Sequence, residues 1–223
     1  MNYRISLTFL GLVMIGFGTV DRGWAVIFIW LGINFVLLGL AHAWHAHRLF
    51  GKRSDGTLPI WSWLFFLPLH TLNTLLWHSI RLLSSEPFQN TVTDSLVVGR
   101  RLLAKEVEGS FDNYVDLTSE FAEPTAIGKS PSYVLFPLLD ASAPSPEALH
   151  SAVTSLRPGR TFVHCAQGHG RTGLFALALL IHSGQASSIE DGLRLLLTAR
   201  PGIRLNREQR HCIEQFVRLQ DVR

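Results

Sequence analysis

The chain has 223 residues, of which 47% are hydrophobic and 17% are charged. This length predicts one or two domains, and the apolar residues are concentrated before residue 84, which favours a membrane-associated protein over a wholly soluble one. The formal net charge of +3 favours anionic partners such as lipid headgroups or phosphate esters, and it is too small to indicate nucleic-acid binding.

Two apolar runs open the chain. Residues 5–20 are close to the lower length limit for a membrane-spanning helix, and residues 24–43 supply about the 20 residues that such a helix needs. A signal peptide is the competing interpretation of the first run, but no small-residue cleavage site precedes a soluble start. Basic residues follow the second run at Arg48, Lys52 and Arg53. We therefore expect two spans joined by a tight turn, with residues 45–58 in the cytoplasm.

A third hydrophobic stretch covers residues 58–83. Pro59 and Pro68 interrupt it, and polar residues recur opposite leucines at helical spacing. This pattern predicts a helix that lies in the membrane interface or is re-entrant. The alternative is a third crossing, which would place the rest of the chain outside the cell.

A histidine cluster, His42, His45 and His47, ends the second run. No further ligands are near it in the sequence, so we interpret it as an interfacial polar cluster and expect no metal there.

The composition changes to that of a soluble α/β domain from about Ser84. We expect a membrane-anchoring helical segment over residues 1–83, a linker over 84–94 and the soluble domain over 95–223. Strands are predicted over residues 96–100, 113–117, 133–136 and 161–164, where the chain is continuously apolar. Helices are predicted to begin after Ser145, which precedes a proline, and near Asn206, which opens a sequence resembling a capping box.

A glycine-rich loop follows the last expected strand. It runs from Val163 to Gly173 as VHCAQGHGRTG, and the apolar residues 174–181 behind it predict a helix. Successive backbone N–H groups of such a loop, together with a helix N-terminus, form a concave anion site. Cys165 lies at its mouth, where the same partial positive charge stabilises a thiolate nucleophile. Arg171 follows six positions later, a spacing that can return its guanidinium to the anion.

This loop resembles the signature His-Cys-x-x-x-x-x-Arg-Ser/Thr of the protein tyrosine and dual-specificity phosphatases. The fixed positions are filled by His164, Cys165, Arg171 and Thr172. The resemblance covers roughly residues 95–220 and implies an α/β domain with a central, mostly parallel sheet flanked by helices. It also implies metal-independent phosphoryl transfer to Cys165, with no cofactor.

A second catalytic partner is expected, because a phosphoryl group that moves from an ester oxygen to sulfur leaves an oxyanion that needs a proton. Asp140 is the candidate acid, since it follows a strand and precedes a proline-bearing loop, which matches the place of the general acid in dual-specificity phosphatases. Its carboxylate can then activate the water that hydrolyses the phosphocysteine. Asp116 is the competing candidate, but residues 115–118 resemble a structural strand end of the family.

Further residues are expected to support these groups. By the same resemblance, His164 is a structural partner of the loop, while Thr172 is expected to donate its hydroxyl to the thiolate and Gln209 to help position water. Substrate contacts are expected from Ala166, Gln167, Gly168, His169, Gly170 and Arg204. Structural alternatives stay open: His169 as a solvent-facing loop residue, Gln209 as part of a helix cap and Arg204 as a surface charge.

The sequence therefore predicts a multi-pass, membrane-anchored phosphatase whose catalytic domain faces the cytoplasm. Both Cys165 and Cys212 are expected to be reduced, since a disulfide between them would disable the nucleophile. Phosphotyrosine or phosphoserine/threonine proteins are the expected substrates, and a phospholipid or phosphoinositide at the bilayer surface is the alternative. Residues 166–170 contain no lysine or arginine to favour a multiply phosphorylated lipid. A membrane scaffold or a weakly active phosphate-binding module is the alternative from another class.

Overall fold

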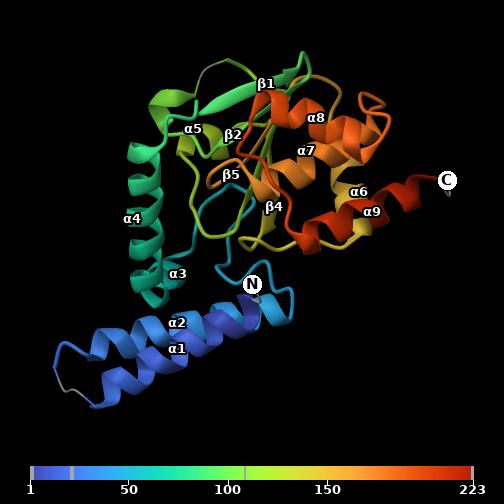
Figure 1. Ribbon diagram of the computed structural model, residues 1–223. Coiled ribbons are helices and arrows are strands. Elements are labelled where there is room, and N and C mark those ends of the chain that lie inside the picture. Colours follow the sequence, from blue (N-terminus) through green and yellow to red (C-terminus); the bar gives the residue numbers. More distant parts are fainter. Residues whose placement is uncertain (1–2, 21–22, 108, 222–223) are drawn as a thin grey trace. The chain divides into compact units, whose positions relative to one another are not determined.

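The computed structural model describes residues 3–20, 23–107 and 109–221 (Figure 1). The chain divides into two compact units. The first unit comprises residues 1–53, 57–84 and 119–122, and the second comprises residues 54–56, 85–118 and 123–223. Most of the expected membrane-anchoring segment therefore lies in the first unit, and most of the chain after Ser84 lies in the second.

Two apolar helices, α1 (Tyr3–Val20) and α2 (Val26–Ala43), form a hairpin in the first unit (Figure 1). Each has 18 residues, and their mean hydropathies are 1.5 and 2.1. The helices approach closely at Gly11 and Gly32, where a Cβ on one glycine would lie 2.5 or 2.6 Å from the carbonyl oxygen of the other. Close approach through small residues is typical of helix pairs in membranes. Both helices are long and apolar enough to be candidate spans, as the sequence predicts.

The third hydrophobic stretch forms two helices, α3 (Ile60–Phe65) and α4 (Leu67–Leu83), rather than one. Pro68 explains the break at Phe66, because its ring and its missing N–H are incompatible with the interior of a continuous helix.

The junction between α3 and α4 is hydrogen-bonded to α2. The carbonyl oxygen of Phe65 accepts hydrogen bonds from Trp30 Nε1 at 2.8 Å and from Asn34 Nδ2 at 3.2 Å. A second polar contact lies at this joint, where Ser62 Oγ and His70 Nε2 are 3.3 Å apart and both residues are buried. The polar groups of this apolar region are thus paired with one another.

The second unit is built on a five-stranded sheet with the order β1-β2-β5-β3-β4. Its strands are β1 (Gln89–Thr93), β2 (Leu96–Arg100), β3 (Asn113–Thr118), β4 (Tyr133–Leu138) and β5 (Thr161–Cys165). Only the β1–β2 pair is antiparallel, and the other pairs are parallel. This mixed sheet, flanked by helices, is the α/β fold that the sequence predicts.

The first strand lies where the sequence predicted a linker over residues 84–94. β1 is an edge strand of polar composition, QNTVT, and no apolar pattern announces it. It is a strand because it pairs with β2 from Gln89 opposite Gly99 to Thr93 opposite Leu96. Tertiary pairing therefore decides its structure rather than its own propensity.

The helices of the second unit are the 3₁₀ helix η1 (Ala104–Glu106), α5 (Thr125–Gly128), α6 (Pro146–Thr154), α7 (Gly170–His182), α8 (Ile189–Ala199) and α9 (Arg207–Asp221). Helices α6, α7 and α9 lie where the sequence predicts helices, whereas the sequence made no prediction for the others. Ser145 caps α6, since its hydroxyl accepts the N–H of Ala148 at 3.2 Å. Asn206 and Gln209 exchange two hydrogen bonds of 2.9 and 3.1 Å at the start of α9.

Strand β5 lies at the centre of the sheet, between β2 and β3 (Figure 1). Val163 and Cys165 belong to the large core that contains α7, and Phe162 packs with Val97 and Tyr114 in a second cluster. The loop after β5 thus leaves the carboxyl edge of the sheet between two neighbouring strands, the usual place for a ligand site in open α/β sheets.

Candidate active site

The expected nucleophile is the last residue of β5. The Cys165 side chain is buried, with 4% of the residue exposed, and the backbone N–H of Gly168 donates to its sulfur at 3.3 Å. Gly168 has φ = +76°, and a Cβ there would strike the backbone of Gly99 and Arg100. The turn that directs this N–H at the sulfur therefore requires glycine.

Arg171 lies in the first turn of α7 and is 2% exposed. Its Nη1 donates to the carbonyl oxygens of Leu138 at 2.9 Å and of Leu117 at 3.4 Å. Its Nη2 lies 3.2 Å from Asp140 Oδ1. The ends of β3 and β4 thus hold the guanidinium from one side, and the expected acid holds it from another.

The loop that carries Asp140 is tied to the start of α9. The next residue, Ala141, adopts φ = +57°, which is a strained conformation for a residue with a Cβ. Asn206 Nδ2 donates to the carbonyl oxygen of Ala141 at 2.7 Å, and Gln209 Nε2 donates to that of Ser142 at 3.2 Å. Gln209 therefore contacts the loop that carries Asp140, as well as being part of a helix cap.

Thr172 is completely buried, and among the described residues its hydroxyl has no hydrogen-bond partner. The expected hydrogen bond from Thr172 to the Cys165 sulfur is therefore not made in this structure. Of the other expected residues in the loop, Ala166 and Gln167 are half-buried. Gly170 lies against the side chain of Gln209 and the backbone of Arg204, and the side chain of Arg204 is exposed.

His164 lies completely buried behind the nucleophile. Its ring stacks on Phe162 with a centroid distance of 5.6 Å and lies 5.0 Å from the ring centroid of Tyr114. Its Nε2 is 3.8 Å from Asp116 Oδ1. The structural role of His164 stays a prediction.

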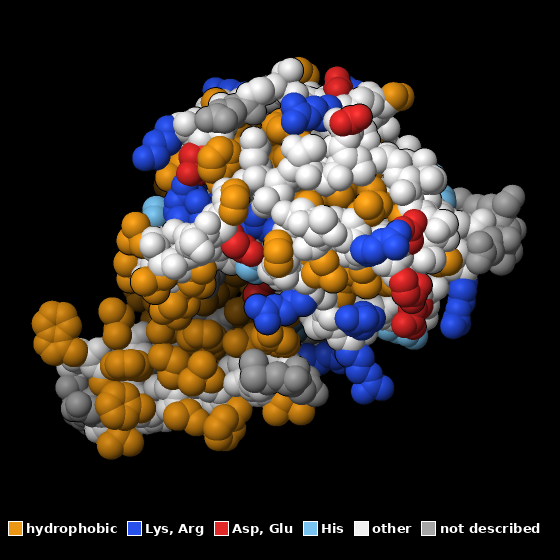
Figure 2. Space-filling model, turned by 45° about the horizontal axis from the view of Figure 1, so that its top comes forward, with side chains coloured by type: hydrophobic (Ala, Val, Ile, Leu, Met, Phe, Trp, Pro, Cys, Tyr) orange, Lys and Arg blue, Asp and Glu red, His pale blue; other side chains and the backbone are white. Residues whose placement is uncertain are grey.

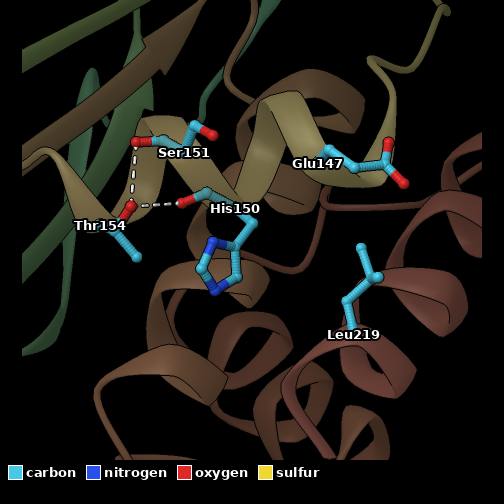
Figure 3. Close-up of a pocket in the computed structure, with 5 residues that line it drawn as sticks. All are labelled: Glu147, His150, Ser151, Thr154 and Leu219. Carbon is cyan, nitrogen blue, oxygen red and sulfur yellow. Dashed lines mark hydrogen bonds between the residues drawn. The ribbon is translucent and has the colours of Figure 1, made fainter. Parts of the chain in front are cut away.

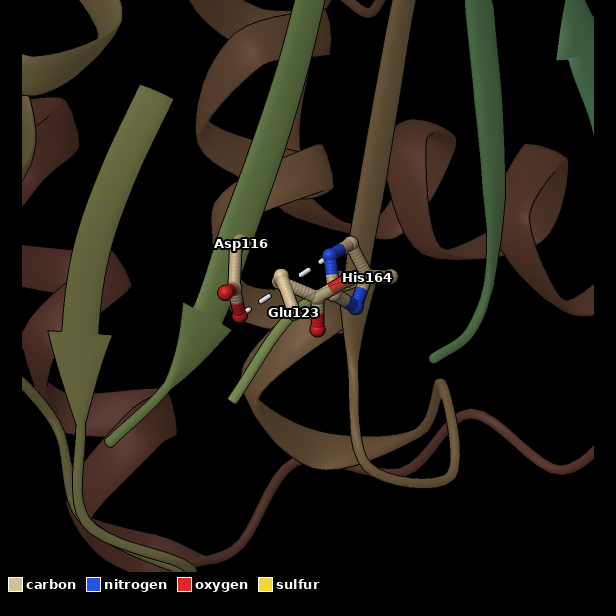
Figure 4. Close-up of side chains that lie close together, drawn as sticks. All are labelled: Asp116, Glu123 and His164. Carbon is tan, nitrogen blue, oxygen red and sulfur yellow. Dashed lines mark ion pairs between the residues drawn. The ribbon is translucent and has the colours of Figure 1, made fainter. Parts of the chain in front are cut away.

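Ligand atoms of Asp116, Glu123 and His164 lie within 4.8 Å of one another (Figure 4). The carboxylates are already hydrogen-bonded: Tyr133 donates to Asp116 at 2.8 Å, and Arg101 Nε donates to Glu123 at 3.1 Å. Burial and the Asp116 carboxylate raise the pKa of Tyr133 well above its usual range, so Tyr133 stays a donor. We interpret the group as a buried polar network rather than a metal site.

Two further residues, Arg200 and Glu86, contribute to the contacts around this loop. Arg200, 1% exposed, donates from Nη2 to the carbonyl oxygen of Gln167 and from Nε to that of Gly168, both at 2.9 Å. Glu86 Oε2 lies 2.7 Å from His169 Nε2 and 3.1 Å from Arg200 Nη2. Residues 200–209 resemble the segment that packs against the signature loop in dual-specificity phosphatases, but the sequence assigned no role to Arg200 itself, and it placed Glu86 only in a linker.

A surface pocket elsewhere on the second unit is lined by Glu147, His150, Ser151 and Thr154 of α6 and by Leu219 of α9 (Figure 3). It contains none of the expected site residues. The chemistry that the sequence predicts therefore gathers at the carboxyl edge of β5 and not in this pocket.

The second unit contains a region that is similar to known proteins. Residues 114–215 match the family described as "Swiss Army Knife protein, DSP-PTPase phosphatase domain". No curated protein matches the chain.

Solved phosphatase structures share the fold of the second unit. Tk-PTP in its active form is 21% identical, with a TM-score of 0.50, and the match covers 58% of this chain and 96% of that chain. Human DUSP28 is 18% identical, with a TM-score of 0.51, and the match covers 60% and 97%. The human tyrosine phosphatase-like serine/threonine/tyrosine-interacting protein is 13% identical, with a TM-score of 0.51 and coverage of 59% and 97%. Residues 114–215 are therefore similar to a DSP-PTPase phosphatase domain, and the chain shares the fold of these solved structures.

Proposed function

We propose that this protein hydrolyses phosphoric monoesters at a membrane surface through a phosphocysteine on Cys165. The observation that carries the proposal is the Arg171–Asp140 ion pair of 3.2 Å beside a loop whose Gly168 N–H points at the Cys165 sulfur. Nucleophile, anion-binding arginine and acid are the three groups that the reaction needs.

In the first step, the Cys165 thiolate attacks phosphorus while the ester oxygen leaves with its bonding pair and takes the proton of Asp140. Loop N–H groups and Arg171 stabilise the charge on the equatorial oxygens. In the second step, the Asp140 carboxylate accepts a proton from water as that water attacks phosphorus. The S–P bond breaks, and inorganic phosphate and the thiolate are released.

Phosphoproteins are the substrate class that the loop favours. The cationic side chain that reaches the anion from the loop is Arg171, because residues 166–170 contain no lysine or arginine and His169 is engaged by Glu86. One guanidinium with backbone amides suits a single phosphate group. Binding of a multiply phosphorylated headgroup would require additional cationic side chains in the loop.

The first unit supports attachment to a membrane. Helices α1 and α2 carry the candidate spans, and hydrophobic side chains cover the N-terminal helices (Figure 2). On α3 and α4 the exposed large apolar residues are Ile60, Trp61, Trp63, Leu64, Phe65, Leu67, Leu75, Leu76, Ile80, Leu82 and Leu83. Such a surface contacts lipid more favourably than water. Arg48, Lys52 and Arg53 orient the catalytic unit to the cytoplasm in this proposal.

This apolar surface is the observation that favours the second candidate, a phospholipid monoester. Anchoring the site at the bilayer raises its effective concentration near headgroups.

The test uses the full chain in detergent, with para-nitrophenyl phosphate as substrate and a chelator present. Turnover that is lost in Cys165→Ser and kept in Cys212→Ser supports the phosphatase. Equal activity in parent and Cys165→Ser rules it out and leaves a scaffold or binding module. Parallel assays on a phosphotyrosine peptide and on vesicles that contain phosphatidyl phosphate then decide between the two substrate classes.

A further inference from the structure

We infer that Glu86 is a positioning residue of the phosphate loop, which it holds through Arg200 and His169. The inference rests on the proposed function, because it assigns Glu86 a part in forming the anion site of that reaction. Glu86 does not touch the reacting atoms and acts through the two residues that it pairs with.

The first step of the argument concerns the carbonyl groups of the loop. An anion cup needs N–H groups that point inward, and the carbonyls of the same peptides must then point away and find donors. Arg200 supplies these donors to Gln167 and Gly168. The guanidinium thereby fixes the orientation of two successive peptides of the cup.

The second step concerns what fixes Arg200. Its Nη1 donates to the carbonyl oxygen of Pro87 at 2.9 Å and to Asn90 Oδ1 at 2.7 Å, and its Nη2 donates to Glu86 Oε2 at 3.1 Å. With the two loop carbonyls, these bonds use all five N–H groups of the guanidinium. Glu86 is the only acidic partner among them, and a buried guanidinium needs such a countercharge.

The third step concerns His169, the residue immediately before α7. The same Glu86 oxygen that binds Arg200 lies 2.7 Å from His169 Nε2. Gly202 leaves room for this contact, because a Cβ at position 202 would collide with both Glu86 and His169. The Glu86 carboxylate therefore connects His169, at the end of the loop, to Arg200, which binds the carbonyl oxygens of Gln167 and Gly168.

Glu86 lies close to the end of α4 in the sequence. Glu86 is the third residue after Leu83, the last residue of α4. Glu86 therefore lies in the first residues of the second unit that follow α4 in the chain.

The test compares Glu86→Ala and Glu86→Gln with the matched control Glu190→Ala, an exposed glutamate on α8. We expect kcat/KM to fall on the order of 100-fold in Glu86→Ala, because small displacements of positioning groups cost about that much. Glu86→Gln keeps an oxygen acceptor without the charge and should fall between Glu86→Ala and the parent. Gly202→Ala displaces both partners without removing a charge and should reproduce the loss with Glu86 present.

A second readout does not depend on turnover. Calorimetric binding of inorganic phosphate is measured in a Cys165→Ser background with and without Glu86→Ala, and we expect weaker binding when Glu86 is absent. If the parent shows no Cys165-dependent turnover, the proposed function fails while this comparison still tests Glu86. Equal phosphate affinity and equal kcat/KM in Glu86→Ala and Glu190→Ala would overturn the inference. The Gly202→Ala and Glu86→Gln variants decide it if Glu86→Ala fails to fold.

Discussion

Arg171 and Asp140 form an ion pair across the boundary between protein interior and solvent. The Arg171 side chain is 1% exposed, whereas the Asp140 side chain is 80% exposed, and their charged atoms are 3.2 Å apart. The buried arginine thus keeps a solvent-exposed carboxylate beside the anion site. In the proposed reaction, a phosphate competes with Asp140 for this guanidinium, which leaves the carboxyl group at the rim, where the leaving oxygen needs a proton.

Replacement of Asp140 by asparagine tests its role as acid. We expect kcat of Asp140→Asn to fall about 100-fold or more on phosphoserine peptides, since general acid catalysis is typically worth that much. The loss should be smaller on para-nitrophenyl phosphate, whose leaving group needs little protonation. Steady-state kinetics on both substrates measure the difference. Equal losses on the two substrates would contradict a proton donor.

Replacement of Arg171 by lysine keeps the charge and removes the planar set of donors. The variant cannot contact Leu138, Asp140 and a phosphate at once, so we expect kcat/KM to fall by about 100-fold or more. The same assays measure it, with Arg218→Lys, at an exposed arginine on α9 outside the site, as the matched control. Near-parent activity in Arg171→Lys would show that charge alone suffices.

Substitutions of Asn206 test whether its hydrogen bond to Ala141 positions the loop that carries Asp140. Asn206→Ala removes the donor to Ala141 and also the α9 cap, and loss of a cap costs about 1 kcal/mol of stability. Asn206→Asp keeps the capping oxygen and loses only the amide donor. We therefore expect Asn206→Asp to keep most of the thermal stability while kcat falls several-fold, measured by thermal unfolding and kinetics. Unchanged kcat in both variants would show that the acid loop needs no such tether.

The active-site loop was predictable because its chemistry is local. The residues from Val163 to Gly173 carry their strand, glycine turn and helix start within one contiguous stretch, so the positions of Cys165 and Arg171 follow from spacing. Asp140 lies beside Arg171, within the loop that the order of strand and proline indicated, and its role as the acid stays a prediction. The turn residue Gly168 and the cap at Asn206 also agree with local rules.

The contacts that tie this loop to the rest of the fold were not predictable. Glu86 and Arg200 meet although 114 positions separate them in the chain, and no local pattern predicts that the two side chains pair. The role of β1 also depends on its pairing with β2 rather than on its own polar sequence. Thr172 was expected to bond the sulfur, but the geometry of the first turn of α7 buries its hydroxyl away from any described partner.

The two cysteines are expected to differ in reactivity. Burial, together with the nearby Glu147 and Glu208 carboxylates, raises the pKa of the Cys212 thiol to about 12. Its sulfur also donates to the carbonyl oxygen of Pro144 at 3.3 Å. Because the thiolate is the reactive species, iodoacetamide at about pH 8 should label Cys165 and leave Cys212 unlabelled in the folded protein. Peptide mass spectrometry measures this, and labelling of both residues on unfolding is the control.

Glu86 is expected to make the stability of the catalytic unit sensitive to acid. The hydrogen bond from His169 and the charge of Arg200 outweigh burial and hold the pKa of Glu86 below its usual range. A carboxyl group whose pKa is lower in the folded than in the unfolded protein stabilises the fold fully above the unfolded value, about 4.3. That contribution is lost as the pH falls through the folded pKa.

Thermal unfolding of parent and Glu86→Gln as a function of pH measures this contribution. We expect the parent to be the more stable protein near neutral pH and the difference between the two to shrink as the pH falls below about 4, since protonated Glu86 and glutamine are then both neutral. Glu190→Gln, which removes an exposed carboxylate, should show little difference at any pH. A difference between parent and Glu86→Gln that grows with acidity would mean that the carboxylate is better stabilised in the unfolded chain, contrary to its contacts with His169 and Arg200.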